Sequence, residues 1–397
     1  MKQGWETKKL GEVCSLITDG DWIESRHQSE DGIRLIQTGN IGCGIFKAKD
    51  DKPHYISEEI FEELGCTEIF SGDCLVSRLP EPVGRACIIP KMDCRMITAV
   101  DCTVIRFKEI LKPELFVYYS QSGTYQRDIN NNTTGTTRKR ISRKNLEQVS
   151  IPVPPLPEQE KIVSELDCLS GIIEKKRQQL KELDALAQSI FYEMFGNPVE
   201  NERGWEVKTI DDFCSSIVRG PFGSALKKEY FIPPTPTSYK VYEQKHAIQK
   251  NEKIGTYYIS AERFETLSRF EVKVGDIIMS CSGTIGEFFE IPVGAERGLM
   301  NQALLKFTLG NSIDKVYFLY AMEWVKDNFE KKGTGLQNIG SVGTIKKTNI
   351  SLPPLPLQQT FAQKVEAIEK QKEQIKQSII EAETLLASRM QYYFEEG

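Results

Sequence analysis

The sequence lacks long hydrophobic runs, and histidine is scarce. Among its 397 residues, no apolar run reaches the roughly 18 residues that a membrane-spanning helix needs. The first residues, MKQGWETKKLGEV, contain no apolar core of a secretory signal, so we expect a cytoplasmic protein. The three histidines, His27, His54 and His246, do not have the spacing of metal ligands, and no metal site is predicted.

A surplus of basic residues is also missing. The formal net charge is −5, whereas an isolated DNA-binding domain usually carries more basic than acidic residues. Any contact with nucleic acid must therefore come from local basic clusters or from a partner protein. The 10 cysteines include no C-x-x-C pair, so we expect buried reduced thiols rather than zinc ligands.

Recognisable catalytic motifs are absent as well. An adenine methyltransferase should carry an N/D-P-P-Y/F tetrapeptide and a glycine-rich cofactor loop, but Asn197-Pro198-Val199 supplies only half of the tetrapeptide. The segment Gly335–Ser341 has the glycine spacing of a P-loop without its lysine. No nucleophile elbow occurs either. We predict a chain without catalytic residues and without a cofactor of its own.

What the sequence does contain is a duplication. Gly4-Trp5-Glu6 recurs as Gly204-Trp205-Glu206, and further segments follow in the same order in both halves. The matching segments are Ser71–Ser77 with Val274–Ser280, Asp101–Phe107 with Asn301–Phe307, Gly135-Thr136-Thr137 with Gly335-Leu336-Gln337, and IPVPPLPEQ with ISLPPLPLQ. A period of about 200 residues is too long for a solenoid repeat, so we infer a duplicated domain.

Each copy joins a β-rich part to a helical part. Short apolar runs broken by Gly and Pro predict strands: CLVSR, ACIIP and CTVIRF in the first copy, and DIIMSC, EFFEIP and ALLKF in the second. In the helical parts, apolar residues recur about every 3.5 positions, the pattern of a coiled-coil seam. The residues expected to pair the helices are Ile162, Leu166, Leu169, Ile173, Leu180, Leu183, Phe361, Val365, Ile368, Ile375, Ile379 and Leu386.

The two helices are expected to pack on each other. The alternative is a pair of amphipathic helices on separate domain cores, for which a wider apolar stripe would be typical. The prolines of each PPLP hinge end the globular part, because proline cannot donate to a sheet ladder, and Pro157 suits a first helical turn. Such a stiff hinge should fix each globular part relative to its helix. Gly196-Asn197-Pro198 should end the first helix.

Two Trp-led domains, each closed by a proline-rich hinge of the IPVPPLPEQ type and a long helix, resemble the specificity (S) subunit of type I restriction–modification systems. The resemblance covers the whole chain. It implies an α+β fold with two pseudo-symmetric α/β target recognition domains, residues 1–152 and 200–352. Two long antiparallel helices, residues 153–199 and 353–397, would separate these domains and form a coiled coil.

The same resemblance implies a function. The chain would be a non-catalytic subunit whose two domains read the halves of a bipartite, asymmetric double-stranded DNA target. Its helices would set the spacer and dock two methylation subunits, and restriction subunits would join the full complex. S-adenosylmethionine and ATP with magnesium are expected on those partner subunits.

Basic and hydroxyl-bearing residues gather just before each hinge. In NNTTGTTRKRISRKN, the guanidinium groups can hold phosphates or guanine, so the first DNA-binding candidates are Thr136, Thr137, Arg138, Lys139, Arg140 and Arg143. The matching segment GTGLQNIGSVGTIKK adds Gln337, Asn338, Lys346 and Lys347. Loops at corresponding strand ends add Arg78, Arg85, Ser282 and Thr284. A solvated basic loop, or an ion pair of Arg78 with a nearby acid, is the structural alternative.

Three other functions fit parts of the pattern. They are a DNA-binding subunit of another bipartite-site restriction–modification enzyme, a methyltransferase or nuclease in its own right, and a coiled-coil assembly protein without nucleic acid. Binding of S-adenosylmethionine by the isolated chain would favour the enzyme. Unchanged function after alanine replacement of Arg138, Lys139 and Arg140 would favour the assembly protein.

Overall fold

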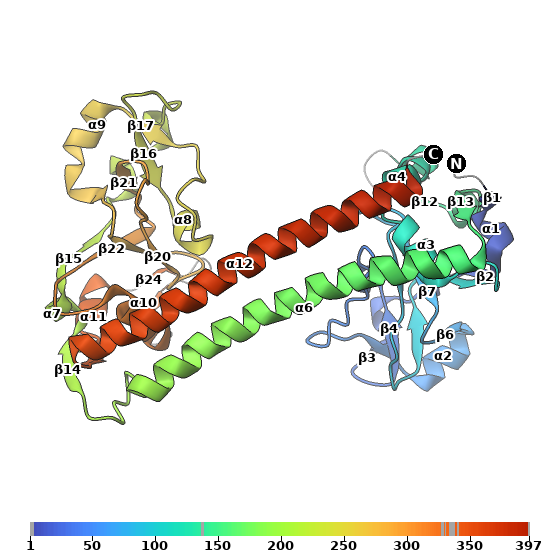
Figure 1. The fold of residues 1–397 in the computed structure, drawn as a ribbon, viewed down its shortest axis with the longest axis horizontal. Helices are drawn as coiled ribbons and strands as arrows, with labels where there is room; N and C mark the ends of the chain where they lie inside the picture. Colours follow the sequence, from blue (N-terminus) through green and yellow to red (C-terminus); the bar gives the residue numbers. More distant parts are fainter. Residues whose placement is uncertain are drawn as a thin grey trace. The chain divides into compact units, whose positions relative to one another are not determined.

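The computed structural model describes residues 4–135, 139–326, 329, 331–332, 338–339 and 341–395. The chain forms two units: unit 1 is Met1–Gln178 with Lys376–Gly397, and unit 2 is Gln179–Ile375. The two long helices, α6 (Leu156–Phe195) and α12 (Leu355–Phe394), are both divided between the units (Figure 1). Unit 1 therefore holds the start of α6 and the end of α12, whereas unit 2 holds the other halves.

Unit 1 is built on two sheets. The first is antiparallel, with the order β2-β10-β7-β8, and the second has the order β3-β5-β4-β9-β6 with β4 and β9 parallel. Their strands are β2 (Cys14–Asp19), β10 (Cys102–Phe107), β7 (Cys74–Ser77), β8 (Ala86–Ile88), β3 (Gln28–Ser29), β5 (Tyr55–Ile56), β4 (Ile33–Ile36), β9 (Met96–Thr98) and β6 (Glu68–Ile69). The predicted runs CLVSR, ACIIP and CTVIRF thus form strands of one sheet.

Short elements complete unit 1. Strand β1 (Glu6–Lys9) pairs with β13 (Ser150–Val153), so the Trp-led start of the domain is tied to the strand that enters the hinge. Strands β11 (Thr133–Thr134) and β12 (Arg140–Ile141) form a hairpin. The helices are α1 (Leu10–Val13), η1 (Ser25–His27), η2 (Thr38–Asn40), α2 (Glu58–Leu64), α3 (Pro113–Tyr119), α4 (Gly123–Asn131) and α5 (Arg143–Glu147).

Unit 2 repeats this plan. Its sheets have the orders β15-β22-β19-β20 and β17-β16-β21-β18, again with one parallel pair, β16 with β21. The strands are β15 (Cys214–Arg219), β22 (Leu304–Leu309), β19 (Ile277–Ser280), β20 (Phe288–Glu290), β17 (Tyr258–Ile259), β16 (Tyr239–Tyr242), β21 (Gly298–Met300) and β18 (Glu271–Val272), with β14 (Glu206–Thr209) paired to β25 (Asn349–Leu352) and β23 (Lys331–Lys332) to β24 (Asn338–Ile339). The helices are α7 (Ile210–Phe213), η3 (Gly223–Ala225), η4 (Lys228–Tyr230), α8 (Gln244–Ile248), α9 (Ala261–Thr266), η5 (Ser268–Phe270), α10 (Lys315–Val325) and α11 (Val342–Lys346).

The strand pairing corrects the predicted repeat register in two places. Cys74 faces Ile105 in unit 1 and Ile277 faces Phe307 in unit 2, so Ile105 corresponds to Phe307 and not to Leu305 as predicted. In the hairpins, Thr134 faces Arg140 and Lys332 faces Asn338, so Thr134 corresponds to Lys332, an offset of 198 residues and not the predicted 200. Connections of unequal length between equivalent strands account for both errors.

One buried glutamine fastens each hinge to its domain. The Lys112 N–H donates to Gln159 Oε1 at 2.9 Å, and Gln159 Nε2 donates to the carbonyl oxygens of Ile110 and Pro154, each at 2.8 Å. In unit 2, Gln358 accepts a hydrogen bond from the Asp314 N–H at 2.8 Å and donates to the Pro353 carbonyl oxygen at 2.7 Å. These bonds give the predicted stiffness of the hinge a physical basis.

The helices α6 and α12 pack on each other in antiparallel orientation within each unit. In unit 1, Arg389 forms an ion pair with Glu165, and the Tyr393 hydroxyl donates to Glu165 Oε2 at 2.5 Å. In unit 2, Lys372 Nζ lies 2.7 Å from Asp184 Oδ1. The structure places all the seam residues at buried or half-buried positions. Helix α6 ends as predicted, with Gly196 in the left-handed conformation (φ +71°).

The cysteines partly depart from expectation. All 10 are free thiols, but Cys43, Cys94 and Cys168 are exposed rather than buried. Among the buried ones, burial raises the pKa of Cys14 and of Cys87 to about 12, which keeps both thiols protonated. Within the described part of the chain, none of the helices has the length and apolar character that a membrane crossing requires.

Candidate nucleic-acid interface

In unit 1, two strands end at one edge of the first sheet. Strands β2 and β7 lie on either side of β10 and are both antiparallel to it, so Asp19 and Ser77, their last residues, lie next to the first residues of β10. Arg78, directly after β7, forms an ion pair with Asp19. The Ile141 N–H donates to the Arg78 carbonyl oxygen at 3.2 Å, which brings the hairpin β11–β12 to the same edge.

A surface depression of about 720 Å³ lies at this edge. It is lined by Asp19, Arg78, Thr134, Arg140, Ser142, Arg143, Lys144 and Glu147. Its basic groups are partly neutralised within the domain, since Arg140 Nη2 lies 2.8 Å from Asp101 Oδ1 and Arg143 Nε lies 3.5 Å from Glu147 Oε1. Lys139 and Lys144 are exposed. The depression can offer guanidinium, ammonium and hydroxyl donors to an anionic ligand.

The two arginines predicted at strand ends are both buried. Arg78 forms an ion pair with Asp19, so the alternative role, pairing with a nearby acid, is the one found. Arg85 donates to the carbonyl oxygens of Ile41 (2.7 Å), Leu79 (2.7 Å), Pro82 (3.0 Å) and Thr38 (2.8 Å). With its donors engaged by these carbonyl groups, Arg85 organises the loops around it and is a poor candidate for DNA contact.

Unit 2 has a depression of the same size at the equivalent edge. Its volume is about 720 Å³, and its lining is Arg219, Gly220, Pro221, Phe222, Arg269, Phe270, Ser282, Gln302, Ala303 and Ile339. Arg219 ends β15 as Asp19 ends β2, and Cys281 follows β19 as Arg78 follows β7. The Ile339 N–H donates to the Cys281 carbonyl oxygen at 3.1 Å, the counterpart of the bond from Ile141 to Arg78.

The chemistry of the second depression differs from that of the first. Arg219 Nη1 donates to the Ile339 carbonyl oxygen at 3.3 Å. At this strand end, unit 2 therefore has a guanidinium group where unit 1 has the carboxylate of Asp19. Burial raises the pKa of the Cys281 thiol to about 12, which leaves this position uncharged. The predicted contact Ser282 lines the depression, and Thr284 is exposed in the same loop.

The other residues predicted for DNA contact are placed as follows. Lys346 Nζ lies 3.0 Å from Asp211 Oδ1, beside the start of β15 and therefore at the opposite end of that strand from Arg219. Lys347 is exposed. Thr136, Thr137, Arg138 and Gln337 lie outside the described residues, and for Asn338 only the backbone in β24 is described.

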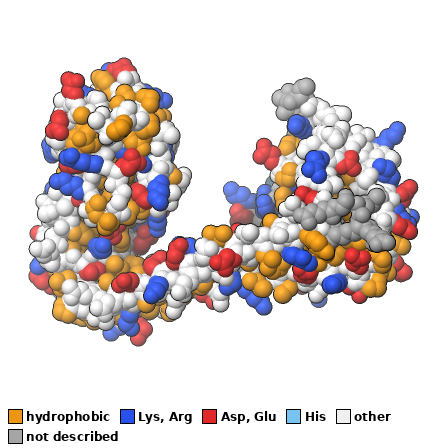
Figure 2. Space-filling model, turned by 45° about the horizontal axis from the view of Figure 1, so that its top comes forward, with side chains coloured by type: hydrophobic (Ala, Val, Ile, Leu, Met, Phe, Trp, Pro, Cys, Tyr) orange, Lys and Arg blue, Asp and Glu red, His pale blue; other side chains and the backbone are white. Residues whose placement is uncertain are grey.

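Sequence reasoning missed Arg219, Arg269 and Gln302. A signal for Arg219 was present, because it stands 200 positions after Asp19 in the repeat set by Trp5 and Trp205. Gln302 lies in the matched segment Asn301–Phe307, just before β22, but nothing in that segment marked it as a contact. No pattern in the sequence pointed to Arg269, which lies in η5. Figure 2 shows acidic and basic side chains interspersed over the visible face of each unit, in line with the acidic net charge.

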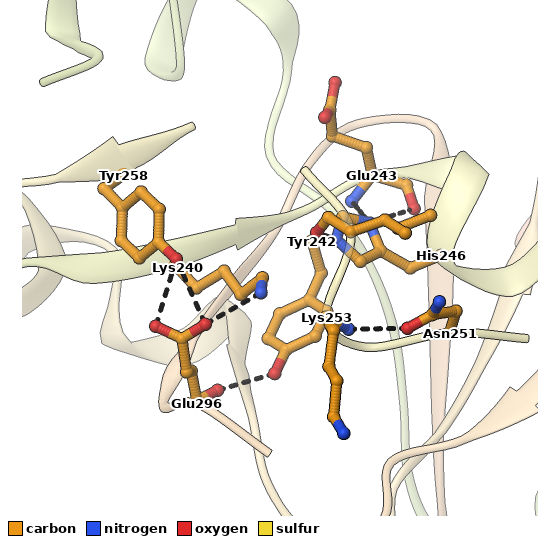
Figure 3. Close-up of polar contacts among 9 residues, drawn as sticks. Lys240, Tyr242, Glu243, His246, Asn251, Lys253, Tyr258 and Glu296 are labelled. Carbon is orange, nitrogen blue, oxygen red and sulfur yellow. Dashed lines mark hydrogen bonds and ion pairs between the residues drawn. The ribbon is translucent and has the colours of Figure 1, made fainter. Parts of the chain in front are cut away.

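A polar cluster beside the second sheet of unit 2 is held by internal hydrogen bonds and an ion pair (Figure 3). The buried Lys240 Nζ lies 2.8 Å from Glu296 Oε1, the Tyr258 hydroxyl donates to the same carboxylate at 3.1 Å, and the Tyr242 hydroxyl donates to the Glu296 carbonyl oxygen at 2.6 Å. The Lys240 ammonium lowers the pKa of Glu296. His246 Nε2 donates to the Ile254 carbonyl oxygen at 2.7 Å. The cluster joins β16 and β17 to the segment just before β21 and to α8. Among the described residues, no group of His, Cys, Asp or Glu could hold a metal ion.

A duplicated domain with an equivalent depression in each copy, carried on two shared helices, defines a two-site binding protein. Residues 2–184 and 202–384 each match the type I restriction modification DNA specificity domain. The chain belongs to this family, which confirms the resemblance found in the sequence. Specificity subunits are the non-catalytic components of type I restriction–modification systems, and this chain is one of them.

Relatives and solved structures agree with this assignment. A protein of Methanocaldococcus jannaschii, provisionally named the type I restriction enzyme MjaX specificity subunit, is 22% identical over 408 residues, covering 95% of this chain and 91% of the relative. The EcoKI specificity subunit of Escherichia coli is 19% identical over 211 residues, 51% of this chain and 44% of the relative.

The solved structures show the same fold. The S subunit of a type I restriction–modification system from M. genitalium has a TM-score of 0.53 at 12% identity, covering 100% of this chain and 99% of that chain. A chain from a study of complex assembly in the type I R-M system has a TM-score of 0.62 at 18% identity, covering 99% of this chain and 98% of that chain.

Proposed function

We propose that this subunit reads a bipartite, asymmetric DNA target, one half with the domain of each unit. The observation that carries the proposal is the pair of equivalent depressions with different linings. Arg140 and Arg143 in unit 1 suit guanine or phosphate, whereas Gln302 in unit 2 can form two hydrogen bonds with adenine. Unlike linings at equivalent places are what an asymmetric target requires.

The helices α6 and α12 would set the spacer between the two half-sites and dock two methylation subunits, with restriction subunits joining the full complex. Each helix is continuous over its 40 residues and belongs to both units, which supports a ruler function. Apolar side chains also remain exposed on these helices, at Ile172 and Leu186 on α6 and at Ile380 and Leu385 on α12. Such residues support a protein-binding surface.

The test is to express the chain with its methylation subunits, to map the methylated bases by sequencing and to footprint the purified complex. We expect two protected half-sites with an unspecified spacer. Replacing Lys139 and Arg140 together by alanine should weaken binding and reduce the slope of log affinity against log salt by about 1–2, because up to two phosphate contacts are lost. The salt dependence of this variant is compared with that of a second variant, in which Lys346 and Lys347 of unit 2 are both replaced by alanine.

Protection of one continuous site without an unspecified centre would contradict the bipartite proposal. An unchanged salt dependence in the Lys139 and Arg140 variant would remove the hairpin of unit 1 from the interface.

A further inference from the structure

Each unit exposes one aromatic side chain at the same point of the fold. In unit 1 it is Trp22, three residues after the end of β2, and in unit 2 it is Phe222, three residues after the end of β15. Trp22 is 67% exposed and Phe222 is 90% exposed. A single exposed apolar side chain is common on a protein surface, but exposed aromatic rings at equivalent positions of two duplicated domains are a shared feature of the fold.

The equivalence of the two positions is set by the backbone. The Gly20 N–H donates to the Cys102 carbonyl oxygen and the Gly220 N–H to the Leu304 carbonyl oxygen, both at 2.9 Å, where Cys102 and Leu304 begin the neighbouring strands β10 and β22. A side chain at Gly20 would collide with the carbonyl oxygens of Thr98 and Ala99, and one at Gly220 with that of Asn301. Both turns therefore require glycine, and both place an aromatic residue two positions later.

The backbone on either side of each ring is anchored. In unit 1, the Asp21 N–H donates to the Thr98 carbonyl oxygen at 2.8 Å, Asp21 Oδ2 accepts from the Thr67 N–H at 2.8 Å, and Ile23 packs into the core of the second sheet. In unit 2, the Ala225 N–H donates to the Phe222 carbonyl oxygen at 2.8 Å. Each ring is thus presented from an ordered segment.

The surroundings favour nucleic acid over a protein surface. Phe222 borders the depression that contains Arg219, Arg269 and Gln302. Trp22 follows Asp19, which lines the basic depression of unit 1. An aromatic ring beside cationic and amide groups, as at Phe222, suits a base step of DNA: the ring can stack on or between bases, while the neighbouring groups bind phosphate or base edges. Trp22 occupies the equivalent position in unit 1.

We propose that Trp22 and Phe222 are equivalent base-stacking residues, each acting on the half-site read by its own unit. This inference rests on the proposed function, because it requires that both units bind DNA. Every base has a face on which a ring can stack, so the rings would supply a shared, sequence-tolerant contact. The unlike linings of the depressions would then supply the discrimination between bases.

The test uses the full complex with methylation subunits and a duplex that carries the target found by methylation mapping, with 2-aminopurine placed in one half-site at a time. Trp22→Ala and Phe222→Ala should each weaken binding by about 5- to 150-fold, the range measured for loss of one stacked base. Trp22→Ala should change the 2-aminopurine fluorescence in one half-site and Phe222→Ala in the other. Trp22→Phe and Phe222→Trp should keep most of the affinity.

Phe70→Ala and Val293→Ala are the matched controls. Phe70 is 52% exposed and Val293 is 92% exposed, and both lie beyond the opposite end of the first sheet of their unit.

If the wild-type complex binds its bipartite target while the Trp22→Ala and Phe222→Ala variants bind as tightly as these controls, the stacking role is wrong and the proposed function stands. If an alanine variant loses the methylation subunits and not the DNA, the ring is a protein contact, and the inference is again wrong. A wild-type complex that binds no bipartite target would overturn the proposed function together with this inference.

Discussion

At the residue scale, two glutamines fasten the hinges through hydrogen bonds that only a buried amide can supply. Replacing Gln159 by leucine leaves the Lys112 N–H and the carbonyl oxygens of Ile110 and Pro154 without this partner. Each buried polar group without a hydrogen bond is costly, so Gln159→Leu should lower the free energy of unfolding by roughly 2–5 kcal/mol. Urea denaturation would measure the change.

The second hinge provides a matched pair for the same measurement. Gln358 is buried, whereas its neighbour Gln359 is exposed. Gln358→Leu should destabilise the protein and Gln359→Leu should change its stability by about 0.5 kcal/mol or less. Equal effects of the two substitutions would show that the buried amides do not hold the hinge.

His246 should make stability depend on pH. Burial lowers the pKa of this imidazole below its ordinary value of 6.5, and the ring is held neutral, with Nε2 donating to the Ile254 carbonyl oxygen and Nδ1 accepting from the Glu243 N–H. Below pH 6.5 the unfolded chain takes up a proton that the folded chain resists, so stability falls as the pH falls through this window. Well above pH 6.5 both states are neutral and the histidine contributes no pH dependence.

Urea unfolding at pH 7.5 and pH 5.5 would measure this contribution. His246→Asn should reduce the loss of stability between the two pH values, whereas His54→Asn, at an exposed position, should leave it unchanged. If His246→Asn shows the full wild-type loss, the buried imidazole is not its source.

Single-residue roles were the hardest feature to predict from the sequence. Arg78 and Arg85 were predicted from their basic character, yet Arg78 is buried against Asp19 and Arg85 against four carbonyl groups. Whether an arginine faces solvent depends on which acids and carbonyl groups the fold brings near it, and those come from distant parts of the chain. The partners of Gln159 were hidden for the same reason.

At the element scale, local patterns were sufficient. The strands in CLVSR and DIIMSC, the end of α6 at Phe195 and both long helices lie where the sequence predicts them, because periodicity, Gly and Pro act over short distances. The repeat register was wrong by two residues at β22 and at β24, because sequence similarity alone does not fix the length of each loop.

The seam of α6 allows a direct comparison within one helix. Leu166 is fully buried in the core of unit 1, and Leu186 is 46% exposed. Leu166→Ala should lower the free energy of unfolding by about 2–5 kcal/mol, because it leaves a cavity. Leu186→Ala should change it by no more than about 0.5 kcal/mol. Similar losses at both positions, measured by urea denaturation, would contradict the narrow seam predicted from the sequence.

At the scale of the whole molecule, both long helices are divided between the two units. The sequence predicts residues 153–199 and 353–397 as two helical segments that pack on each other, and each segment contributes to both units. Half of α12 packs in the core of unit 1, where Tyr393 and Phe394 join Leu166, and Phe361 packs with Phe191 in unit 2. The seam in the sequence predicts that Leu166 and Phe361 pair the helices, but it does not show which residues about 200 positions away they meet.

If the shared helices set the spacer, lengthening both should lengthen the target. Seven residues inserted between Gln178 and Gln179 in α6, and seven between Ile375 and Lys376 in α12, fall at the boundaries of the two units. Seven residues keep the seam in phase and add about 10 Å of helix at roughly 1.5 Å per residue. This corresponds to about three base pairs at roughly 3.4 Å each.

Methylation mapping of the lengthened protein should then return the same two half-sites with a spacer about three base pairs longer, since neither reading domain has changed. Insertion of three residues at the same places interrupts the heptad pattern at the unit boundary and changes the winding of the coiled coil there. It should abolish methylation, because the two domains are turned relative to each other although the helix contacts inside each unit remain. The decisive result is the spacer of the seven-residue variant. If both half-sites are methylated at the original spacing, the distance between them is set by the DNA or by the methylation subunits, and the helices only hold the two domains in one chain.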